Sequence, residues 1–189
     1  MQKIIVGLTG ATGIIYGIRL LEVLQSISDI EVHLIISTAA KQTISIETSY
    51  KIKNIQSMAD FVYENKNIGA NIASGSFITS GMIIIPCSIK TLSGINNSYN
   101  DTLITRAADV VLKEKRKLIL GIRETPLHLG HLQLMVNVCK IGGIIFPPLP
   151  AFYSHPKTIE DIVNQTINRL LDQYGIHLKD ELFNRWSGN

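Results

Sequence analysis

Short runs of Ile, Val and Leu that do not alternate with polar residues recur along this chain. The runs expected to form strands are Lys3–Leu8, Val32–Ile36, Met82–Ile85, Leu118–Ile122 and Gly143–Phe146. Strands that are buried on both faces of a parallel sheet have this uniform apolar character. The segments between them have the three- and four-residue apolar spacing of covering helices: Tyr16–Ser26, Ala39–Ser49, Thr91–Asn96, Asp101–Lys115 and His131–Cys139. The sequence therefore predicts an α/β fold with a doubly wound, mainly parallel sheet and helices on both faces.

A last helix is expected over Thr158–Tyr174. Thr158 is suited to the N-cap, Asp161 stands where a capping-box acid would lie, and Gly175 follows the expected end. The chain of 189 residues contains no internal repeat and no low-complexity linker. We therefore expect a single domain over residues 1–175, with the C-terminal tail, residues 176–189, as a candidate cover for the site.

The composition excludes several classes of protein. Hydrophobic residues make up 46% of the chain and charged residues 17%, which is unlike a disordered protein. A net charge of +3 is too small for a general nucleic-acid binder. The longest uncharged stretch, residues 67–89, is rich in Asn, Ser and Gly, so no membrane span is expected. The chain shows no targeting segment, and its cysteines lack C-x-x-C spacing, so we expect a reducing, cytoplasmic location.

A glycine-rich turn joins the first expected strand to the first helix, with the sequence Gly7-Leu8-Thr9-Gly10-Ala11-Thr12-Gly13. Backbone N–H groups and the helix dipole favour anion binding in such a connection. The G-x-x-G-x-x-G spacing differs from that of dinucleotide sites, and Ser37 stands where such a site would have an acid. We therefore expect an anion site that does not hold a dinucleotide; the alternative is that the glycines serve only a tight turn.

A second hydroxyl-rich turn, Pro86-Cys87-Ser88-Ile89-Lys90-Thr91, follows the strand Met82–Ile85. Ligands of open parallel sheets bind at the carboxyl ends of strands near the switch in winding order, where both turns are expected to lie. The two turns would then face one crevice. Alternatively, Ser88 and Thr91 are only helix caps and Cys87 is only a small buried side chain.

Basic residues that could approach a phosphate lie farther along the chain. Arg106 and Lys113 are seven positions apart on one expected helix and share a face, although a charge run of this kind is usually a solvated surface. Arg123 and Glu124 follow the strand Leu118–Ile122, which suits phosphate binding and proton transfer; a surface ion pair is the alternative.

Two further features have less specific interpretations. Glu124, His128 and His131 have spacing that a metal could use on a helix, but Pro126 interrupts the helix, so no metal is expected. The segment 147–150 could be a PxxP motif for a partner. The residues that follow it, Ala151-Phe152-Tyr153, instead favour an apolar wall that ends in one hydroxyl, which suits a small apolar ligand with a polar head.

Taken together, these segments resemble the flavin prenyltransferases, the UbiX family, formerly described as aromatic acid decarboxylases. The matching segments are Gly10–Gly17, Ser74–Phe77, Gly81-Met82, Pro86–Thr91, Arg106–Val110, Arg123–Leu127 and Pro147–Tyr153. They occur in the family's order over nearly the whole chain, and Pro86–Thr91 with Arg123–Leu127 is far more specific than a lone glycine turn.

The resemblance implies a Rossmann-like, flavodoxin-like flavoprotein. Such an enzyme joins a dimethylallyl group from dimethylallyl phosphate to N5 and C6 of reduced FMN, without a metal. The product, prenylated FMN, serves a UbiD-type decarboxylase, as in ubiquinone biosynthesis. The family also implies a homo-dodecamer. Whether the prenyl donor is a monophosphate or a diphosphate stays open.

The resemblance also assigns roles to residues. The implied FMN contacts are Gly10, Ala11, Thr12, Ser37, Ser88, Ile89, Lys90, Thr91 and Arg123. The implied prenyl-phosphate contacts are Arg106, supplied by a neighbouring subunit, and Lys113, Glu124, Tyr153 and Arg169. The implied catalytic residues are Glu124, Lys113, Thr12 and Glu47, and Trp186 matches an aromatic residue of the family's tail. Thr12 stands where the family usually has Ser, and Ile89 where it has Met.

Two other functions remain open at this point. A flavin-binding module could store or deliver prenylated FMN without making it, and the Thr12 change keeps this possibility open. A related flavin-dependent enzyme decarboxylates a peptidyl cysteine, but it would lack the segments Arg123–Leu127 and Pro147–Tyr153, which are present here.

Overall fold

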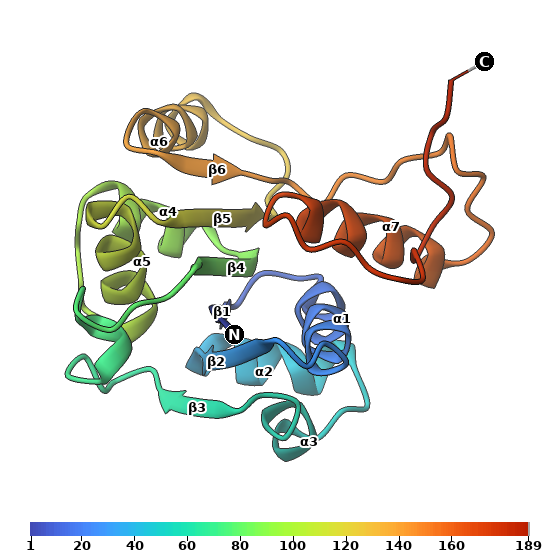
Figure 1. Ribbon diagram of the computed structural model, residues 1–189. Coiled ribbons are helices and arrows are strands. Elements are labelled where there is room, and N and C mark those ends of the chain that lie inside the picture. Colours follow the sequence, from blue (N-terminus) through green and yellow to red (C-terminus); the bar gives the residue numbers. More distant parts are fainter. Residues whose placement is uncertain (189) are drawn as a thin grey trace. The chain divides into compact units, whose positions relative to one another are not determined.

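One sheet of six parallel strands forms the centre of the computed structural model, which describes residues 1–188 (Figure 1). The strands are β1 (Gln2–Leu8), β2 (Ile30–Ile36), β3 (Phe61–Glu64), β4 (Gly81–Cys87), β5 (Lys117–Ile122) and β6 (Gly143–Ile145). Their spatial order is β3-β2-β1-β4-β5-β6, and every neighbouring pair is parallel. The winding direction therefore reverses between β1 and β4, which confirms the doubly wound α/β prediction and is the Rossmann-like order.

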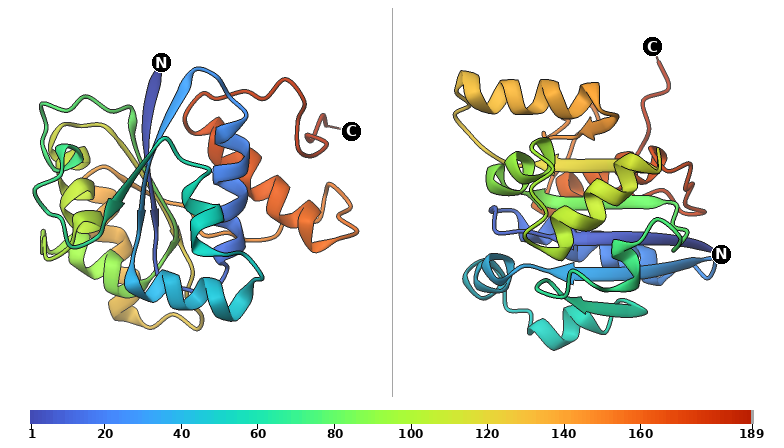
Figure 2. Two further views of the ribbon diagram at one scale, coloured as in Figure 1. Left: turned by 90° about the horizontal axis from the view of Figure 1, so that it is seen from below. Right: turned by 90° about the vertical axis from the view of Figure 1, so that its left-hand side faces the viewer.

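Helices cover both faces of this sheet. They are α1 (Ile14–Gln25), α2 (Thr38–Glu47), α3 (Ile52–Gln56), α4 (Ile89–Asn96), α5 (Leu103–Lys113) and α6 (Leu129–Lys140), with a short 3₁₀ helix, η1, at Asn71–Ala73. Figure 1 shows α4 and α5 on one side of the sheet and α1 and α3 on the other, and Figure 2 shows the same two layers from below. This arrangement explains the uniform apolar runs, because all seven residues of β4 are buried, as are Ile4–Leu8 of β1.

Side-chain caps fix where several helices begin. Ser37 caps α2, Ser88 caps α4 and Thr102 caps α5, in each case by accepting a hydrogen bond from a backbone N–H of the first turn. The predicted capping box of the last helix, α7 (Ile159–Asp172), is confirmed, since Thr158 and Asp161 each accept the other's backbone N–H. That helix ends at Asp172, two residues before the expected Tyr174, and Gln173 is its C-cap. Gly175 follows in a left-handed conformation.

The sequence prediction missed β3, α3 and η1. Phe61 and Val62 of β3 are exposed, and the strand lies at the edge of the sheet with only four residues. A short edge strand does not need the continuous apolar run by which the central strands were found. The five-residue α3 is likewise too short to show a helical period.

The described residues divide into two compact units, residues 1–147 and a second unit that begins at Pro148. The second unit contains α7, the segment that leads to it, and an irregular tail from Gln173 to Gly188. The expected single domain over residues 1–175 stays a prediction, because compactness alone does not show whether a unit folds by itself. Among residues 1–188, no helix is both long and apolar enough to cross a membrane.

Candidate active site

A cavity of about 950 Å³ opens in the first unit where the strand order reverses. The register aligns the strand ends around it, since Leu8 of β1 lies beside Ile36 of β2 and Gly7 lies beside Ile84 of β4. The residues that line it come from the segments after β1, β2, β3 and β4, from the α4–α5 connection, and from α2, α4 and α5. They are Thr9, Gly10, Ser37, Thr38, Ala39, Gln42, Asn65, Lys66, Ser88, Lys90, Thr91, Ser93, Gly94, Asn97, Tyr99, Asp101, Thr102, Ile104 and Thr105. The two predicted turns therefore do face one crevice.

Two helix N-termini point polar groups toward this cavity. Ser37 Oγ accepts a hydrogen bond from the backbone N–H of Ala40 (3.0 Å), at the start of α2. Ser88 Oγ accepts one from the backbone N–H of Thr91 (3.3 Å), at the start of α4, and lies 3.1 Å from Thr91 Oγ1. Helix N-termini with free N–H groups and nearby hydroxyls favour a phosphate. Ser88 is thus a helix cap and a cavity residue at once.

Thr9 joins the ends of β1 and β4 beneath the cavity, a role that the sequence analysis missed. Its buried hydroxyl donates a hydrogen bond to the carbonyl oxygen of Pro86 (2.7 Å) and accepts one from the backbone N–H of Ser88 (2.8 Å). Its neighbour Cys87 is also buried, and burial raises the pKa of its thiol, so Cys87 is a core side chain, as the alternative interpretation had it.

The first glycine turn was expected to bind an anion from solution, but a carboxylate of the chain itself lies there. Glu47, the last residue of α2, accepts hydrogen bonds from the backbone N–H groups of Gly13 (2.9 Å) and Ile14 (3.1 Å). The anion at the N-terminus of α1 is therefore the chain's own carboxylate. Gly10 lines the cavity, and a Cβ there would lie 2.3 Å from Ala39 Cβ, so the close approach of this turn to α2 requires glycine.

The other predicted FMN contacts lie near the cavity without lining it. Ala11 and Thr12 are in the glycine turn, and Ile89 is the first residue of α4. Arg123 follows β5, where its backbone N–H donates to the carbonyl oxygen of Cys87 (3.2 Å). Its side chain is exposed and forms no ion pair with Glu124 in the part of the chain that the structure describes. The surface-pair alternative for these two residues is therefore wrong.

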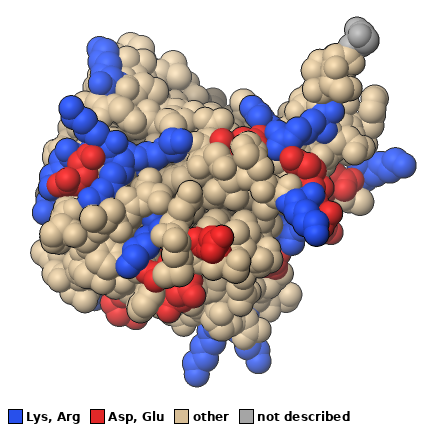
Figure 3. Space-filling model, viewed as in Figure 1, with Lys and Arg blue, Asp and Glu red and all other residues tan. Residues whose placement is uncertain are grey.

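The basic residues of α5 are paired with acids. Arg106 Nη1 lies 3.3 Å from Asp109 Oδ2, and Lys113 Nζ pairs with the carboxylate of Glu114. The hydrogen bond from Lys113 holds the pKa of Glu114 below its usual value. Figure 3 shows Lys and Arg gathered with acidic side chains among them on the side where α5 lies. Whether Arg106 and Lys113 approach a dianion together stays a prediction.

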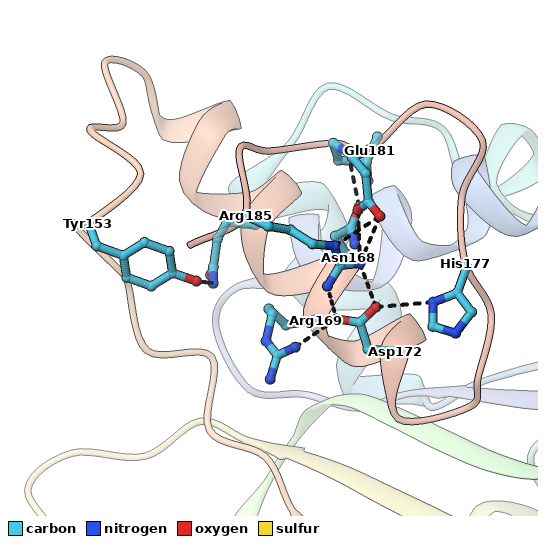
Figure 4. Close-up of polar contacts among 9 residues, drawn as sticks. Tyr153, Asn168, Arg169, Asp172, His177, Glu181 and Arg185 are labelled. Atoms are coloured by element: carbon cyan, nitrogen blue, oxygen red, sulfur yellow. Dashed lines mark hydrogen bonds and ion pairs between the residues drawn. The ribbon is translucent and has the colours of Figure 1, made fainter. Parts of the chain in front are cut away.

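Tyr153 and Arg169 lie together in the second unit. They line a cavity of about 520 Å³ with Phe183, Arg185 and Trp186. The Trp186 ring meets the Tyr153 ring edge-on, with 6.1 Å between the centroids. Figure 4 shows Arg169 and Arg185 at Asp172, near the end of α7, with Tyr153 to one side of them. The sequence analysis missed Phe183 and Arg185, since the tail has no periodic pattern that would mark them.

One of the two histidines considered as metal ligands, His128, caps a helix. His128 Nδ1 accepts a hydrogen bond from the backbone N–H of Gly130 (3.0 Å) and so caps α6, and its ring lies 3.6 Å from that of His131. Within residues 1–188, no three His, Cys, Asp or Glu side chains gather as metal ligands would.

Comparisons with known proteins agree with this architecture. The family model described as Flavoprotein matches residues 1–171. The flavin prenyltransferase UbiX of Escherichia coli (strain K12) is 57% identical over 188 residues, with 100% of both chains covered.

Two solved structures are similar over the whole fold. One is a dodecameric FMN-dependent UbiX-like decarboxylase from Escherichia coli O157:H7, with 48% identity, a TM-score of 0.95 and 100% of each chain covered. The other is AnUbiX in complex with FMN and dimethylallyl pyrophosphate, with 44% identity, a TM-score of 0.96, and 99% of this chain and 98% of that chain covered. Full-length identity at this level confirms the resemblance drawn from the sequence motifs, and the chain belongs to the flavin prenyltransferase (UbiX) family.

Proposed function

We propose that this chain transfers a dimethylallyl group from dimethylallyl phosphate to N5 and C6 of reduced FMN and releases prenylated FMN. The observation that carries the proposal is the 57% identity to a flavin prenyltransferase over the full length, combined with a cavity at the switch point of the sheet. Reduced FMN, when bound, supplies the two nucleophilic positions. The remaining work of binding, charge stabilisation and proton transfer falls to side chains of the chain.

The cavity of the first unit fits FMN in size and chemistry. Its volume of about 950 Å³ is within the range of ligand sites, roughly 300 to 1,000 Å³. Its lining offers hydroxyls, backbone amides and Lys90, which suit a phosphate and a ribityl chain. We assign the FMN phosphate to the N-termini of α2 and α4, through Ser37, Ser88 and Thr91. Gly10, Ala11, Thr12, Ile89 and Arg123 are the further proposed contacts.

The prenyl phosphate needs fixed cations, because a phosphate dianion leaves from an allylic carbon. Each charge-assisted hydrogen bond contributes about 1.5 to 3 kcal/mol, and preorganised charge of this kind is often the largest catalytic term. We propose Arg106, Lys113, Tyr153 and Arg169 for this role, with Arg106 acting from a neighbouring subunit. Phe183 and Trp186 add aromatic rings beside Arg169, which suit an apolar chain with developing positive charge.

Glu124 is the proposed proton carrier. The two new bonds at the flavin displace two protons; one is needed at the prenyl double bond and the other leaves with the phosphate. Glu124 is exposed after β5, and the described hydrogen bond to its carboxylate comes from the backbone N–H of Thr125 (3.1 Å), which leaves Oε2 available. Glu47 fixes the glycine turn next to Thr12, and we propose that these two residues shape the flavin end of the site.

The assembly, recipient and donor are also proposals. The dodecameric relative supports a homo-dodecamer. Prenylated FMN would pass to a UbiD-type decarboxylase in the cytoplasm. The AnUbiX complex contains dimethylallyl pyrophosphate, so the diphosphate has to be tested as a donor beside the monophosphate.

Phosphate release tests this function. The chain is incubated anaerobically with reduced FMN and either donor, and inorganic phosphate or pyrophosphate is measured over time. We expect release that requires both the chain and reduced FMN. Tight FMN binding without release would instead identify a flavin carrier, and tighter binding of NAD than of FMN would contradict the assignment of the cavity.

A further inference from the structure

Asp172, the last residue of α7, is the centre of a charged cluster around Arg169, and none of the roles above uses Asp172 itself (Figure 4). Its side chain is only 10% exposed. Oδ2 accepts hydrogen bonds from Arg169 Nη1 (2.7 Å) and Arg185 Nη1 (2.8 Å), and Oδ1 accepts one from Arg185 Nη2 (2.7 Å). His177 Nδ1 lies 3.8 Å from Oδ1. The bonds from Arg185, and then those from Arg169, hold the pKa of Asp172 below its usual value despite burial.

The two arginines at Asp172 differ in how many donors they have left. Arg185 also donates from Nε and Nη2 to the carboxylate of Glu181 (both 2.9 Å), so each of its nitrogens bonds a carboxylate. Arg169 has 46% of its side chain exposed and gives Asp172 one nitrogen. Its other N–H groups have no partner among residues 1–188. The donor nitrogens of Arg185 are therefore all used in ion pairs within the chain, whereas Arg169 has N–H groups left with which to bind an anion.

The cluster also anchors the tail to α7. The backbone N–H of Leu182 donates to Oδ1 of the buried Asn168 (2.9 Å), and the Arg185 guanidinium lies 5.7 Å from the centre of the Phe183 ring. These contacts hold Phe183 and Trp186 as walls of the 520 Å³ cavity that Tyr153 and Arg169 also line. Without the pairing at Asp172, the segment that carries both rings would keep one fewer attachment to α7.

We propose that Asp172 is a positioning residue for the prenyl phosphate: it directs the Arg169 guanidinium and, through Arg185, holds the aromatic tail beside it. The inference rests on the proposed function, because it takes the prenyl phosphate as the ligand of Arg169. The opposing effect is competition, since a carboxylate next to Arg169 repels a phosphate. The two guanidinium groups of Arg169 and Arg185 balance the charges of the Asp172 and Glu181 carboxylates, which reduces that repulsion.

The test compares Asp172→Asn with Asp180→Asn in the full chain. Asp180 is an exposed acid of the same tail with no ion pair among the described residues, so it is the matched control. We expect Asp172→Asn to raise the KM for the prenyl phosphate about tenfold, in line with one disturbed charge-assisted hydrogen bond. The value of kcat should change little and the FMN affinity should not change. Asp172→Glu should restore part of the loss, and Asp180→Asn should match the unmodified chain.

A second readout does not depend on turnover. Trp186 is the single tryptophan of the chain, so fluorescence anisotropy of the FMN-free protein reports how firmly the tail is held. Anisotropy should fall in Asp172→Asn and in Arg185→Gln and stay unchanged in Asp180→Asn. If no prenyl transfer occurred at all, the proposed function would be wrong. The anisotropy would still show whether Asp172 and Arg185 hold the tail against α7.

An unchanged or lowered KM in Asp172→Asn would overturn the positioning role, since a lowered KM means that competition dominates. Equal anisotropy in all variants would overturn the anchoring. A raised KM together with a matching loss of FMN affinity in Asp172→Asn would also overturn the positioning role, because it would indicate a general loosening of the fold. If Asp172→Asn does not fold, Arg185→Gln provides the same two measurements.

Discussion

Glu124 is exposed after β5, and its carboxylate makes no ion pair with the adjacent Arg123. We therefore expect Glu124→Gln to leave FMN affinity unchanged, since the Glu124 side chain is not among the proposed FMN contacts. Prenyl transfer should slow by at least about tenfold, a lower limit for a lost proton-transfer group, which contributes about 10² to 10⁴. Steady-state assays beside FMN titrations measure both quantities.

The matched control for Glu124 is Glu64→Gln. Glu64 is 77% exposed at the end of β3, and its nearest cation is Lys41 Nζ, 3.8 Å away. This variant should keep full activity. If Glu124→Gln also turned over at the unmodified rate, Glu124 would have no part in proton transfer.

His33 is a buried titratable group on β2 that does not line the cavity. Its Nε2 lies 2.8 Å from Glu31 Oε1, its Nδ1 lies 2.9 Å from the Tyr63 hydroxyl, and its ring stacks on that of Phe61. Burial lowers the pKa of this imidazole below the model-peptide value of 6.5. As pH falls below about 6.5, His33 binds a proton in the unfolded chain more readily than in the folded chain. The free energy of unfolding should therefore decrease.

Denaturant titrations at pH 7.5 and pH 5.5 measure this decrease. His33→Gln should show a smaller decrease between the two pH values, although its stability at pH 7.5 should fall by about 1 to 3 kcal/mol from the lost hydrogen bonds. His155→Gln, which changes an exposed histidine, should retain the full decrease. An equal decrease in all three proteins would show that His33 does not control it.

The junction between β1 and β4 is held by the Thr9 hydroxyl, and Thr9→Val replaces it with a methyl group of similar size. The backbone N–H of Ser88 would lose its partner, which costs about 1 to 3 kcal/mol, whereas the carbonyl oxygen of Pro86 would keep the hydrogen bond from the backbone N–H of Thr9 (3.3 Å). Because Ser88 begins α4 at the cavity, FMN affinity should fall together with stability. Calorimetric titration with FMN and thermal unfolding measure the two effects.

Thr43→Val is the control for Thr9. The Thr43 hydroxyl bonds the carbonyl oxygen of Ala39 within α2 and does not line the cavity. Its loss should leave FMN affinity unchanged. Unchanged FMN affinity in Thr9→Val would show that the β1–β4 junction does not support the cofactor site.

At the level of elements, the sequence was most informative where burial was complete. The central strands follow directly from their Ile- and Val-rich runs, and the capping box at Thr158 follows from hydroxyl and acid spacing. The edge strand β3 was not predictable, because half-exposed residues such as Phe61 need no apolar run. Glu47 at the N-terminus of α1 was not predictable as a cap either, since its two hydrogen bonds join residues more than thirty positions apart.

At the scale of the whole molecule, α6 presents an apolar face that the chain itself does not cover. Leu129, Leu132 and Val136 share one face of this helix and are all exposed. Monomers rarely leave such a patch in water, and a relative with 48% identity is dodecameric. A second copy of the chain is therefore the expected occupant of this face.

Leu132→Glu should shift the protein to smaller species in light scattering coupled to size exclusion, because burying an unpaired carboxylate costs several kcal/mol. Gln133→Glu adds the same charge one position along, outside this face, and should leave the assembly intact. An unchanged mass for Leu132→Glu would exclude this face from the interface.

The grouping of site residues was predictable only within each unit. Gly10, Ser37, Ser88, Lys90 and Thr91 line one cavity, as the two predicted turns implied. Tyr153, Arg169 and Trp186 line another. Arg185 and Asp172 could not be found from the sequence, because their pairing depends on how the irregular tail returns to α7.

The mass of the flavin after turnover shows whether this chain is a prenyltransferase. The chain is incubated anaerobically with reduced FMN and dimethylallyl phosphate, and the extracted flavin is analysed by mass spectrometry. A prenyltransferase adds one C5H8 unit to FMN, and this product should be absent when the chain or the donor is omitted. Recovery of FMN with unchanged mass, from a chain that binds FMN and is supplied with either donor, would show that the chain does not prenylate flavin.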